Sequence, residues 1–115
     1  DEWWSLCMSH VMEPARGAGP VFVHDFPASQ AILARVTSTE PAVAQRFELY
    51  INGMELANGF YELSDAAEQR RRFEANLQHR QQLGLDAVMM NQALIDALEY
   101  GLPDCAGVAL GWIVC

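Results

Sequence analysis

A hairpin signal in the middle of the chain constrains the fold more than any other feature. Asn52-Gly53 separates two apolar-rich runs, FELYI before it and MELA after it. Asn-Gly is the strongest short-range signal for a two-residue turn between antiparallel strands, because both residues of that turn have positive φ. The sequence therefore predicts an antiparallel β-hairpin centred on Asn52-Gly53.

A second Asn-Gly pair follows within the same stretch. If Asn58-Gly59 formed another turn, the strand between the two turns would shrink to MELA. A bulge within one longer strand, Met54–Leu63, is therefore the better prediction. Glu55 and Glu62 have an odd spacing, which places them on opposite faces of a regular strand, and one extra residue at the bulge would bring both to the same face.

Two carboxylates on one sheet face have three chemical uses. They can hold a divalent cation through hard oxygen ligands, divide acid and base roles between them, or bind an ammonium group of a substrate. The alternative is that Glu55 and Glu62 are ordinary solvated strand residues. The spacing alone leaves all of these open.

The remaining pattern predicts an α+β fold, a largely antiparallel sheet flanked by helices. Capping and breaking residues bound the helices, and Trp3 and Trp4 give the first helix an apolar side that we expect to pack on the sheet. The expected elements are a helix near Glu2–Val11, a strand at Pro20–Asp25 broken by Pro27, helices at Ala66–Leu83 (capped by Ser64 or Asp65) and Met89–Tyr100, and a short buried strand at Cys105–Leu110.

Composition narrows the class of protein. The chain has 115 residues, enough for one domain, and 51% of them are apolar, more than a small independent domain needs. The net charge of -8 argues against a general nucleic-acid surface. The three cysteines have no metal-ligand spacing, which is typical of reduced thiols in a cytoplasmic protein. No apolar run reaches membrane-spanning length, so we expect no membrane among the partners. The negative charge likewise makes us expect no DNA.

Three stretches of the chain resemble a known family. They are PVFVHDFPASQAILARV, RFELYINGMELANGFYELSDAAEQRRRF and ALEYGLPDCAGVALG. They are similar to the C-terminal half of class II aminoacyl-tRNA synthetase catalytic domains of the lysyl type, and more so to the truncated paralogous family, the elongation factor P lysine ligases. The likeness runs from about Asp1 to Gly111. It implies ATP with Mg²⁺, activation of lysine or (R)-β-lysine as an acyl-adenylate, and transfer to a lysine side chain of elongation factor P rather than to tRNA.

The resemblance also implies roles for individual residues on the nucleotide side. Glu55, Leu56 and Gly111 match positions of the ATP site, and Glu55 would approach the phosphates through magnesium. Together with Glu62, Glu55 forms the predicted pair of metal-ligating carboxylates. Magnesium binds few carboxylates together with phosphate oxygens and waters, which suits this choice.

Three further residues match the amino-acid site. Glu62 would pair with the ammonium group of the substrate, and Asn58 would lie beside the lysine. Ala109 stands where synthetases of this type generally have glycine, and its methyl group would reshape the pocket in favour of a β-amino acid. Simple drift from glycine to alanine is the alternative. No residue of the chain is predicted to be catalytic.

The chain departs from the family pattern at its end. After GVALG the pattern expects Val-Asp-Arg-Leu, with an arginine that contacts the nucleotide, whereas Trp112–Cys115 read WIVC. Deleting one nucleotide from codons for Gly-Val-Asp-Arg-Leu yields Gly-Trp-Ile-Val-Cys, so we interpret residues 112–115 as a frameshifted, non-native tail. The first two motifs of the class are also missing. We therefore expect residues 1–115 to form a single partial domain that is inactive alone, from a parent that is an enzyme.

Two other functions remain compatible with the sequence. One is a remnant of a lysyl-tRNA synthetase that charges tRNA, and the other is a non-catalytic class II paralogue that acts as a binding module. An unpaired sheet edge and an exposed apolar face also predict association with copies of the same chain, so we expect a homo-oligomer.

Overall fold

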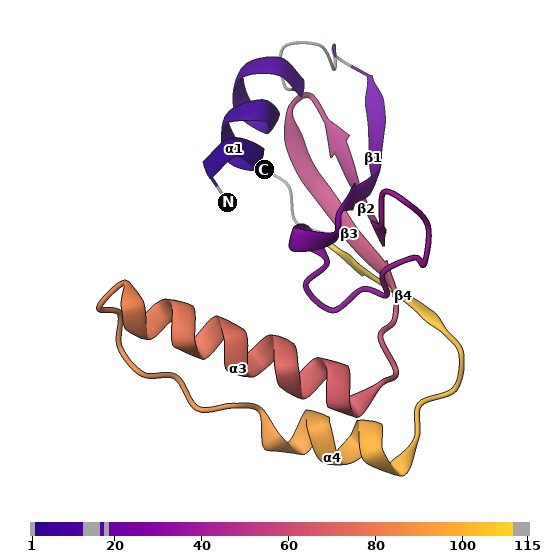
Figure 1. Ribbon diagram of the computed structural model, residues 1–115. Coiled ribbons are helices and arrows are strands. Elements are labelled where there is room, and N and C mark those ends of the chain that lie inside the picture. The colour runs from indigo at the N-terminus through magenta and orange to yellow at the C-terminus, as the bar shows by residue number, and fades with distance from the viewer. Residues whose placement is uncertain (1, 13–16, 18, 112–115) are drawn as a thin grey trace. The chain divides into compact units, whose positions relative to one another are not determined.

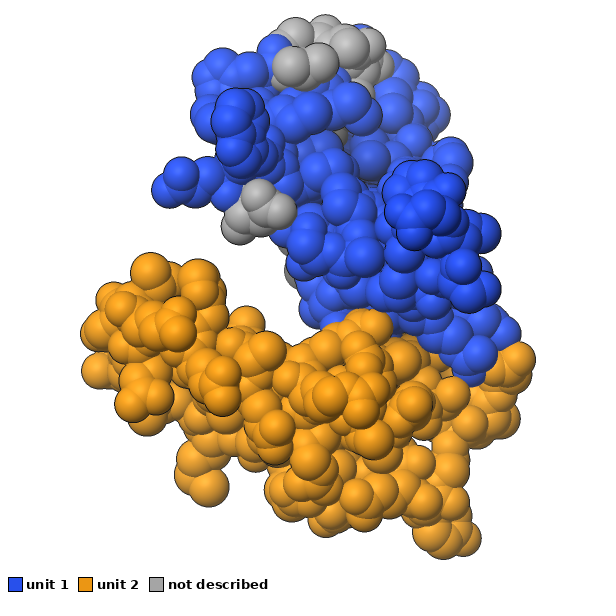
Figure 2. All heavy atoms as spheres, viewed as in Figure 1, with its two compact units in different colours: residues 1–61, 106–115 blue, residues 62–105 orange. Residues whose placement is uncertain are grey.

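The chain divides into two compact units. The computed structural model describes residues 2–12, 17 and 19–111. Figure 2 shows the first unit, residues 1–61 and 106–115, in blue, and the second, residues 62–105, in orange. Strands lie in the first unit and two long helices in the second, so the predicted α+β class is confirmed. The interpretation of residues 112–115 lies outside the described residues.

The first unit is built on a four-stranded antiparallel sheet with the strand order β1-β2-β3-β4 (Figure 1). The second unit is inserted in the chain between β3 and β4, so that β4 returns to the sheet after both helices. The strands are β1 (Pro20–Pro27), β2 (Val43–Ile51), β3 (Met54–Tyr61) and β4 (Ala106–Leu110).

The predicted hairpin is present at the predicted turn. β2 ends and β3 begins on either side of Asn52 and Gly53, whose φ angles are 50° and 75°. Two successive positive φ values match the right-handed twist of the flanking strands, which is why Asn-Gly is favoured here. The turn fixes the register of β2 and β3 beside it, where Ile51 pairs with Met54 and Tyr50 with Glu55.

The bulge lies at a different place from the one predicted. Glu55 and Ala57 pair with consecutive residues of β2, so Leu56 is the extra residue, whereas Asn58 and Gly59 pair in regular register. The prediction of a bulge at Asn58-Gly59 is therefore wrong. Glycine occurs at position 59 because a side chain there would clash with a neighbouring ring, and not because the strand pairing is interrupted.

Gly59 makes room for an aromatic ring of the neighbouring strand. It pairs with Phe47, and a Cβ atom added at Gly59 would lie 2.3 Å from the Phe47 ring. No real Cβ comes that close to a ring carbon, so the ring covers the backbone only because the side chain is absent. The same face of the sheet carries Phe22, whose ring centre is 5.9 Å from that of Phe47.

The opposite face of the sheet holds the core of the first unit. Val23, Phe26 and Ala44 are buried there. Two helical segments, α1 (Glu2–Cys7) and a short π-helix (Met8–Met12), run close to this core, and the Trp4 ring lies 5.2 Å from that of Phe26. The predicted packing of the first helix on the sheet is thus confirmed for Trp4.

Three expectations for the flanking elements need correction. Trp3 is 82% exposed, so only one of the two tryptophans packs on the sheet. β1 continues through Pro27 with an irregularity at Asp25, whose φ of 56° re-aims the strand instead of ending it. β4 forms, but Val108 and Leu110 are 61% and 58% exposed, because they pair with Gly59 and Ala57 on the face opposite the core.

The second unit consists mainly of α3 (Ala66–Gln82) and α4 (Gln92–Tyr100). The Asp65 side chain caps α3 by accepting hydrogen bonds from the N–H groups of Ala67 and Glu68, as predicted. α4 begins three residues later than the predicted Met89, because the Asn91 side chain accepts a hydrogen bond from the Leu94 N–H and sets the start.

Replacing Gly59 by alanine should destabilise the chain by about 1–3 kcal/mol, because the added methyl group must displace the Phe47 ring. The free energy of unfolding in urea measures this. Gly19→Ala is the matched control, since a Cβ there meets no atom within 4 Å. Adding Phe47→Leu to Gly59→Ala should recover part of the loss, and an unchanged stability of the single variant would contradict the close packing.

Candidate functional site

A row of site residues crosses three strands of the sheet. Asn58 on β3 lies opposite Glu48 on β2 and opposite Ala109 on β4. Side chains directly opposite one another share a face, so these three lie side by side on the face that also holds the core. The structure thus brings together Asn58 and Ala109, which were both assigned to the amino-acid site, and adds Glu48 to them.

A buried arginine joins this row. The Arg46 side chain is only 8% exposed, and each of its three nitrogens donates a hydrogen bond to a different group. Nε donates to Oδ1 of Asn58 at 3.2 Å, Nη1 donates to the backbone carbonyl of Gln30 at 2.9 Å, and Nη2 donates to Oε1 of Glu48. The guanidinium group therefore links β2, β3 and the 3-10 turn at Ala28–Gln30.

Aromatic rings hold the guanidinium group in place. Its central carbon lies 4.3 Å from the centre of the Phe26 ring and 5.9 Å from that of Phe60. A cation over an aromatic face gains more when it is desolvated, as Arg46 is here. The planar fork of arginine suits this environment, because it stacks and donates in several directions at the same time.

Glu48 is a fixed carboxylate. It is 7% exposed, and both of its oxygens are occupied: Oε1 accepts from Arg46, and Oε2 accepts from the hydroxyl group of Tyr50. A buried carboxylate requires such partners. Each oxygen retains a second lone pair, so the group can still accept a hydrogen bond or ligate a cation in one defined orientation.

Glu55 lies near Glu48 on the same face. The bulge at Leu56 puts Glu55 opposite Tyr50. Tyr50 is two residues from Glu48 on β2, so both lie on the same face. Glu55 is exposed, but partial desolvation by the surrounding sheet, and then the negative charge of Glu48, raise its pKa above the usual value, while Arg46 partly offsets the shift. The folded chain thus holds this proton to a higher pH than the unfolded chain does, and the resulting stability is lost as the pH rises through the folded pKa.

The Arg46 contact also decides what Asn58 offers to a ligand. Only the amide oxygen of Asn58 can accept a hydrogen bond from Arg46, so the identity of Oδ1 is fixed by chemistry. The NH₂ group is then the free branch of the amide. Asn58 therefore presents two N–H donors, which suit an oxygen acceptor and not an ammonium group.

The three residues assigned to the ATP site are close together. Glu55 and Leu56 are consecutive at the bulge, and the Gly111 N–H donates a hydrogen bond of 2.8 Å to the backbone carbonyl of Leu56. This bond continues the pairing of β3 with β4 beyond Leu110, opposite Ala57. The bulge therefore determines where Gly111 lies.

Glu62 belongs to the second unit. Its N–H donates a hydrogen bond of 3.0 Å to the carbonyl oxygen of Cys105, which closes the two ends of that unit. Glu55 belongs to the first unit, so the prediction that Glu55 and Glu62 face one cleft remains a prediction, as does their joint role as metal ligands. The bulge that this prediction requires between them exists at Leu56.

The carboxylates of the first unit suit magnesium. In the described part of the chain, no group of three or more His, Cys, Asp or Glu side chains could hold a metal ion. Magnesium does not require such a group, because it is held by one or two carboxylates together with phosphate oxygens and waters. Glu48 and Glu55 supply two hard oxygen donors on one face.

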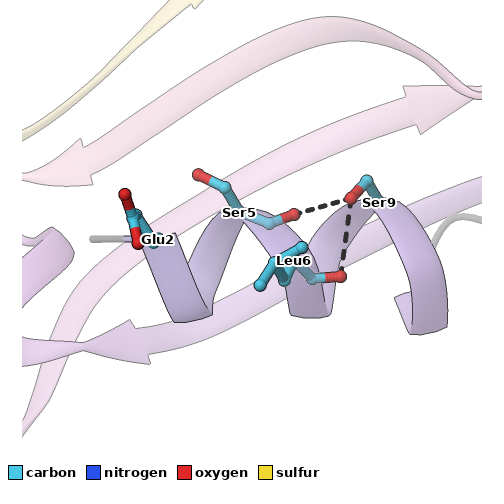
Figure 3. Close-up of a pocket in the computed structure, with 4 residues that line it drawn as sticks. All are labelled: Glu2, Ser5, Leu6 and Ser9. Atoms are coloured by element: carbon cyan, nitrogen blue, oxygen red, sulfur yellow. Dashed lines mark hydrogen bonds between the residues drawn. The ribbon is translucent and has the colours of Figure 1, made fainter.

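Two surface hollows among the described residues are lined by none of these side chains. One, of about 490 Å³, is lined by Glu2, Ser5, Leu6 and Ser9 along the first helix (Figure 3). Its Ser9 hydroxyl donates a hydrogen bond of 2.8 Å to the backbone carbonyl of Ser5. That hydroxyl serves its own helix, and among the described lining residues only Glu2 is charged, so these residues do not repeat the chemistry found on the sheet.

Comparison with known proteins places this sheet in a family. The family described as tRNA synthetases class II (D, K and N) matches residues 8–112. The chain belongs to this family. Such membership agrees with the antiparallel sheet and with the cluster of polar side chains on one of its faces.

Individual relatives are closely similar. The chain is 52% identical to a Vibrio cholerae protein and 55% identical to one from Edwardsiella ictaluri, over 112 residues each, 96% of this chain. A Hamiltonella defensa protein is 49% identical over the same length. All three are named elongation factor P (R)-β-lysine ligase. The chain spans about a third of the length of these curated relatives, 35% in the first case.

The length and composition of the helices decide whether they could cross a membrane. Among those that the structure describes, none combines the length and the apolar character that a bilayer crossing requires.

The sequence interpretation missed three members of the site. Arg46, Glu48 and Tyr50 alternate along β2, and a polar residue at every second position of a strand marks one face. That signal was present in the run RFELY. It was not used because Glu is most often exposed, and burial of Glu48 became visible only with the fold.

Titration of Glu55 tests the electrostatics of this face. Its carboxyl ¹³C resonance should give a pKa above the usual value for glutamate. Glu48→Gln should lower that pKa because a nearby negative charge is lost, and Arg46→Met should raise it further. Glu68, whose pKa is lowered by hydrogen bonds from Arg71 and Arg72, is the internal control. If Glu48→Gln left the pKa of Glu55 unchanged, the proximity of Glu48 and Glu55 would be contradicted.

Proposed function

We propose that the full-length protein, meaning the entire product of the gene that carries this sequence, is an ATP-dependent ligase. It activates lysine or (R)-β-lysine as an acyl-adenylate and transfers the acyl group to a lysine of elongation factor P. The observation that carries this proposal is the 49–55% identity, over nearly the whole chain, to relatives named for that activity.

The nucleotide side of the proposed site is formed by Glu55, Leu56 and Gly111. Their support is the bulge, which fixes the Gly111 N–H on the Leu56 carbonyl and leaves the Glu55 carboxylate on the same face as Glu48. Glu48 and Glu55 would hold magnesium, which neutralises phosphate charge when it is bound. Glu48 thus takes the place that the sequence analysis gave to Glu62 in the metal-ligating pair. Glycine at position 111 leaves room for a ligand to approach the backbone.

The amino-acid side is formed by Asn58, Ala109 and Glu62. Asn58 would donate to an oxygen of the substrate through the NH₂ group that Arg46 leaves free. Ala109, directly across from Asn58, would narrow the space beside it and favour a β-amino acid. Glu62 would pair with the substrate ammonium, since a carboxylate in a partly closed pocket selects a cation.

The acceptor and the assembly state belong to the same proposal. Elongation factor P is favoured over tRNA because the similar relatives are named for it. The net charge of -8 supports this choice, since tRNA binding requires a basic surface. A homo-oligomer and a cytoplasmic location remain predictions.

An activation assay tests the reaction. The full-length protein should catalyse exchange of pyrophosphate into ATP that depends on lysine or (R)-β-lysine, with the β-amino acid preferred. Incubation with elongation factor P should then add the mass of one lysyl group to it, as seen by mass spectrometry. Transfer to tRNA with no mass change on elongation factor P would favour the synthetase alternative, and no exchange at all would favour the binding module.

Replacing Glu62 by glutamine in the full-length protein should weaken amino-acid activation by roughly 2 kcal/mol, because the substrate ammonium loses a charged partner. The loss should appear as a higher KM for the amino acid in pyrophosphate exchange, with the KM for ATP little changed. Glu74→Gln, an exposed carboxylate on α3, is the matched control. Equal kinetics for the two variants would count against the role of Glu62.

A further inference from the structure

We infer that Arg46 is a positioning residue that sets both halves of the site at the same time. It fixes the carboxylate of Glu48 on the nucleotide side and the amide of Asn58 on the amino-acid side. This inference rests on the proposed function and extends it, because Arg46 is itself buried and contacts the groups that would meet the substrates.

The connection to the two halves is direct. Nη2 of Arg46 donates to Glu48, and Nε donates to Asn58 at 3.2 Å. The third donor, Nη1, is anchored to the Gln30 carbonyl at 2.9 Å. Since the guanidinium group is rigid and planar, it cannot turn toward one partner without leaving the other.

The surroundings of Arg46 prevent it from adopting another position. Phe26 and Phe60 flank the guanidinium group, at 4.3 and 5.9 Å. Phe26 is itself 1% exposed and part of the core. The orientation of Glu48 and Asn58 is therefore tied to the packing of the first unit and is set before any ligand binds.

Each partner has a different dependence on Arg46. Glu48 has a second support, the Tyr50 hydroxyl group on its other oxygen. For Asn58, the bond from Arg46 is what distinguishes the oxygen from the NH₂ branch; without it, the amide can turn and present its acceptor. Loss of Arg46 should therefore loosen Glu48 and leave Asn58 without a defined polarity.

Kinetics of the full-length protein test the inference. Arg46→Lys keeps the charge but has a single nitrogen, which cannot reach Glu48, Asn58 and the Gln30 carbonyl at the same time. It should therefore raise the KM for ATP with Mg²⁺ and the KM for the amino acid by about tenfold each. Tyr50→Phe should raise only the first KM, and Asn58→Ala only the second. Arg71→Lys, an exposed arginine on α3, is the matched control.

A second measurement does not need activity. In the full-length protein, NMR relaxation of the Asn58 side-chain NH₂ group should show a rigid amide that becomes mobile in Arg46→Lys and stays rigid in Arg71→Lys. A general loss of folding would instead broaden the backbone resonances of the whole sheet, which separates positioning from stability.

The outcomes distinguish this inference from the function on which it rests. A rise in both KM values together with a mobile Asn58 amide supports it. A rise in one KM alone, or an Asn58 amide that stays rigid in Arg46→Lys, overturns it. If the unmodified full-length protein activates no amino acid, the proposed function is wrong, and the relaxation measurement still decides whether Arg46 holds Asn58.

Discussion

The ion pair between Arg46 and Glu48 is the interaction on which the organised face of the sheet depends. Both side chains are more than nine-tenths buried, and removing one partner of such a pair typically costs about 3–5 kcal/mol because the other charge remains in a poor solvent. Replacement of both by apolar residues could keep the fold. Retention of the pair is therefore better explained by the orientation that it imposes on Glu48 and Asn58 than by stability.

Two small irregularities of the backbone give this face its shape. The extra residue at Leu56 brings Glu55 onto the face of Glu48 and leaves a carbonyl group for Gly111. Gly59 lets the Phe47 ring lie against the strand on the other side. Bulges of this kind re-aim side chains next to functional sites. A one-residue slip of the register would move the site residues to the opposite face of the sheet.

The sheet and the helical insertion have different relations to the proposed chemistry. The first unit by itself brings together Glu48, Glu55, Asn58 and Ala109, all placed by strand pairing. Glu62 is the first residue of the second unit, and its backbone hydrogen bond to Cys105 joins the first and last residues of that unit. Family membership follows from the match over residues 8–112, whereas the candidate site depends on the sheet.

The sequence by itself determined the hairpin and a helix cap at Ser64 or Asp65, because each depends on local chemistry: positive φ at Asn52-Gly53 and a side-chain acceptor at a helix start. The antiparallel class followed from the strand pattern, and the family from three stretches that resemble it. Only the tertiary structure decided the position of the bulge and the burial of Arg46 and Glu48. Those features arise from pairing and packing between residues far apart in the chain. No local pattern specifies which strand residue is left unpaired or which charge finds a partner inside.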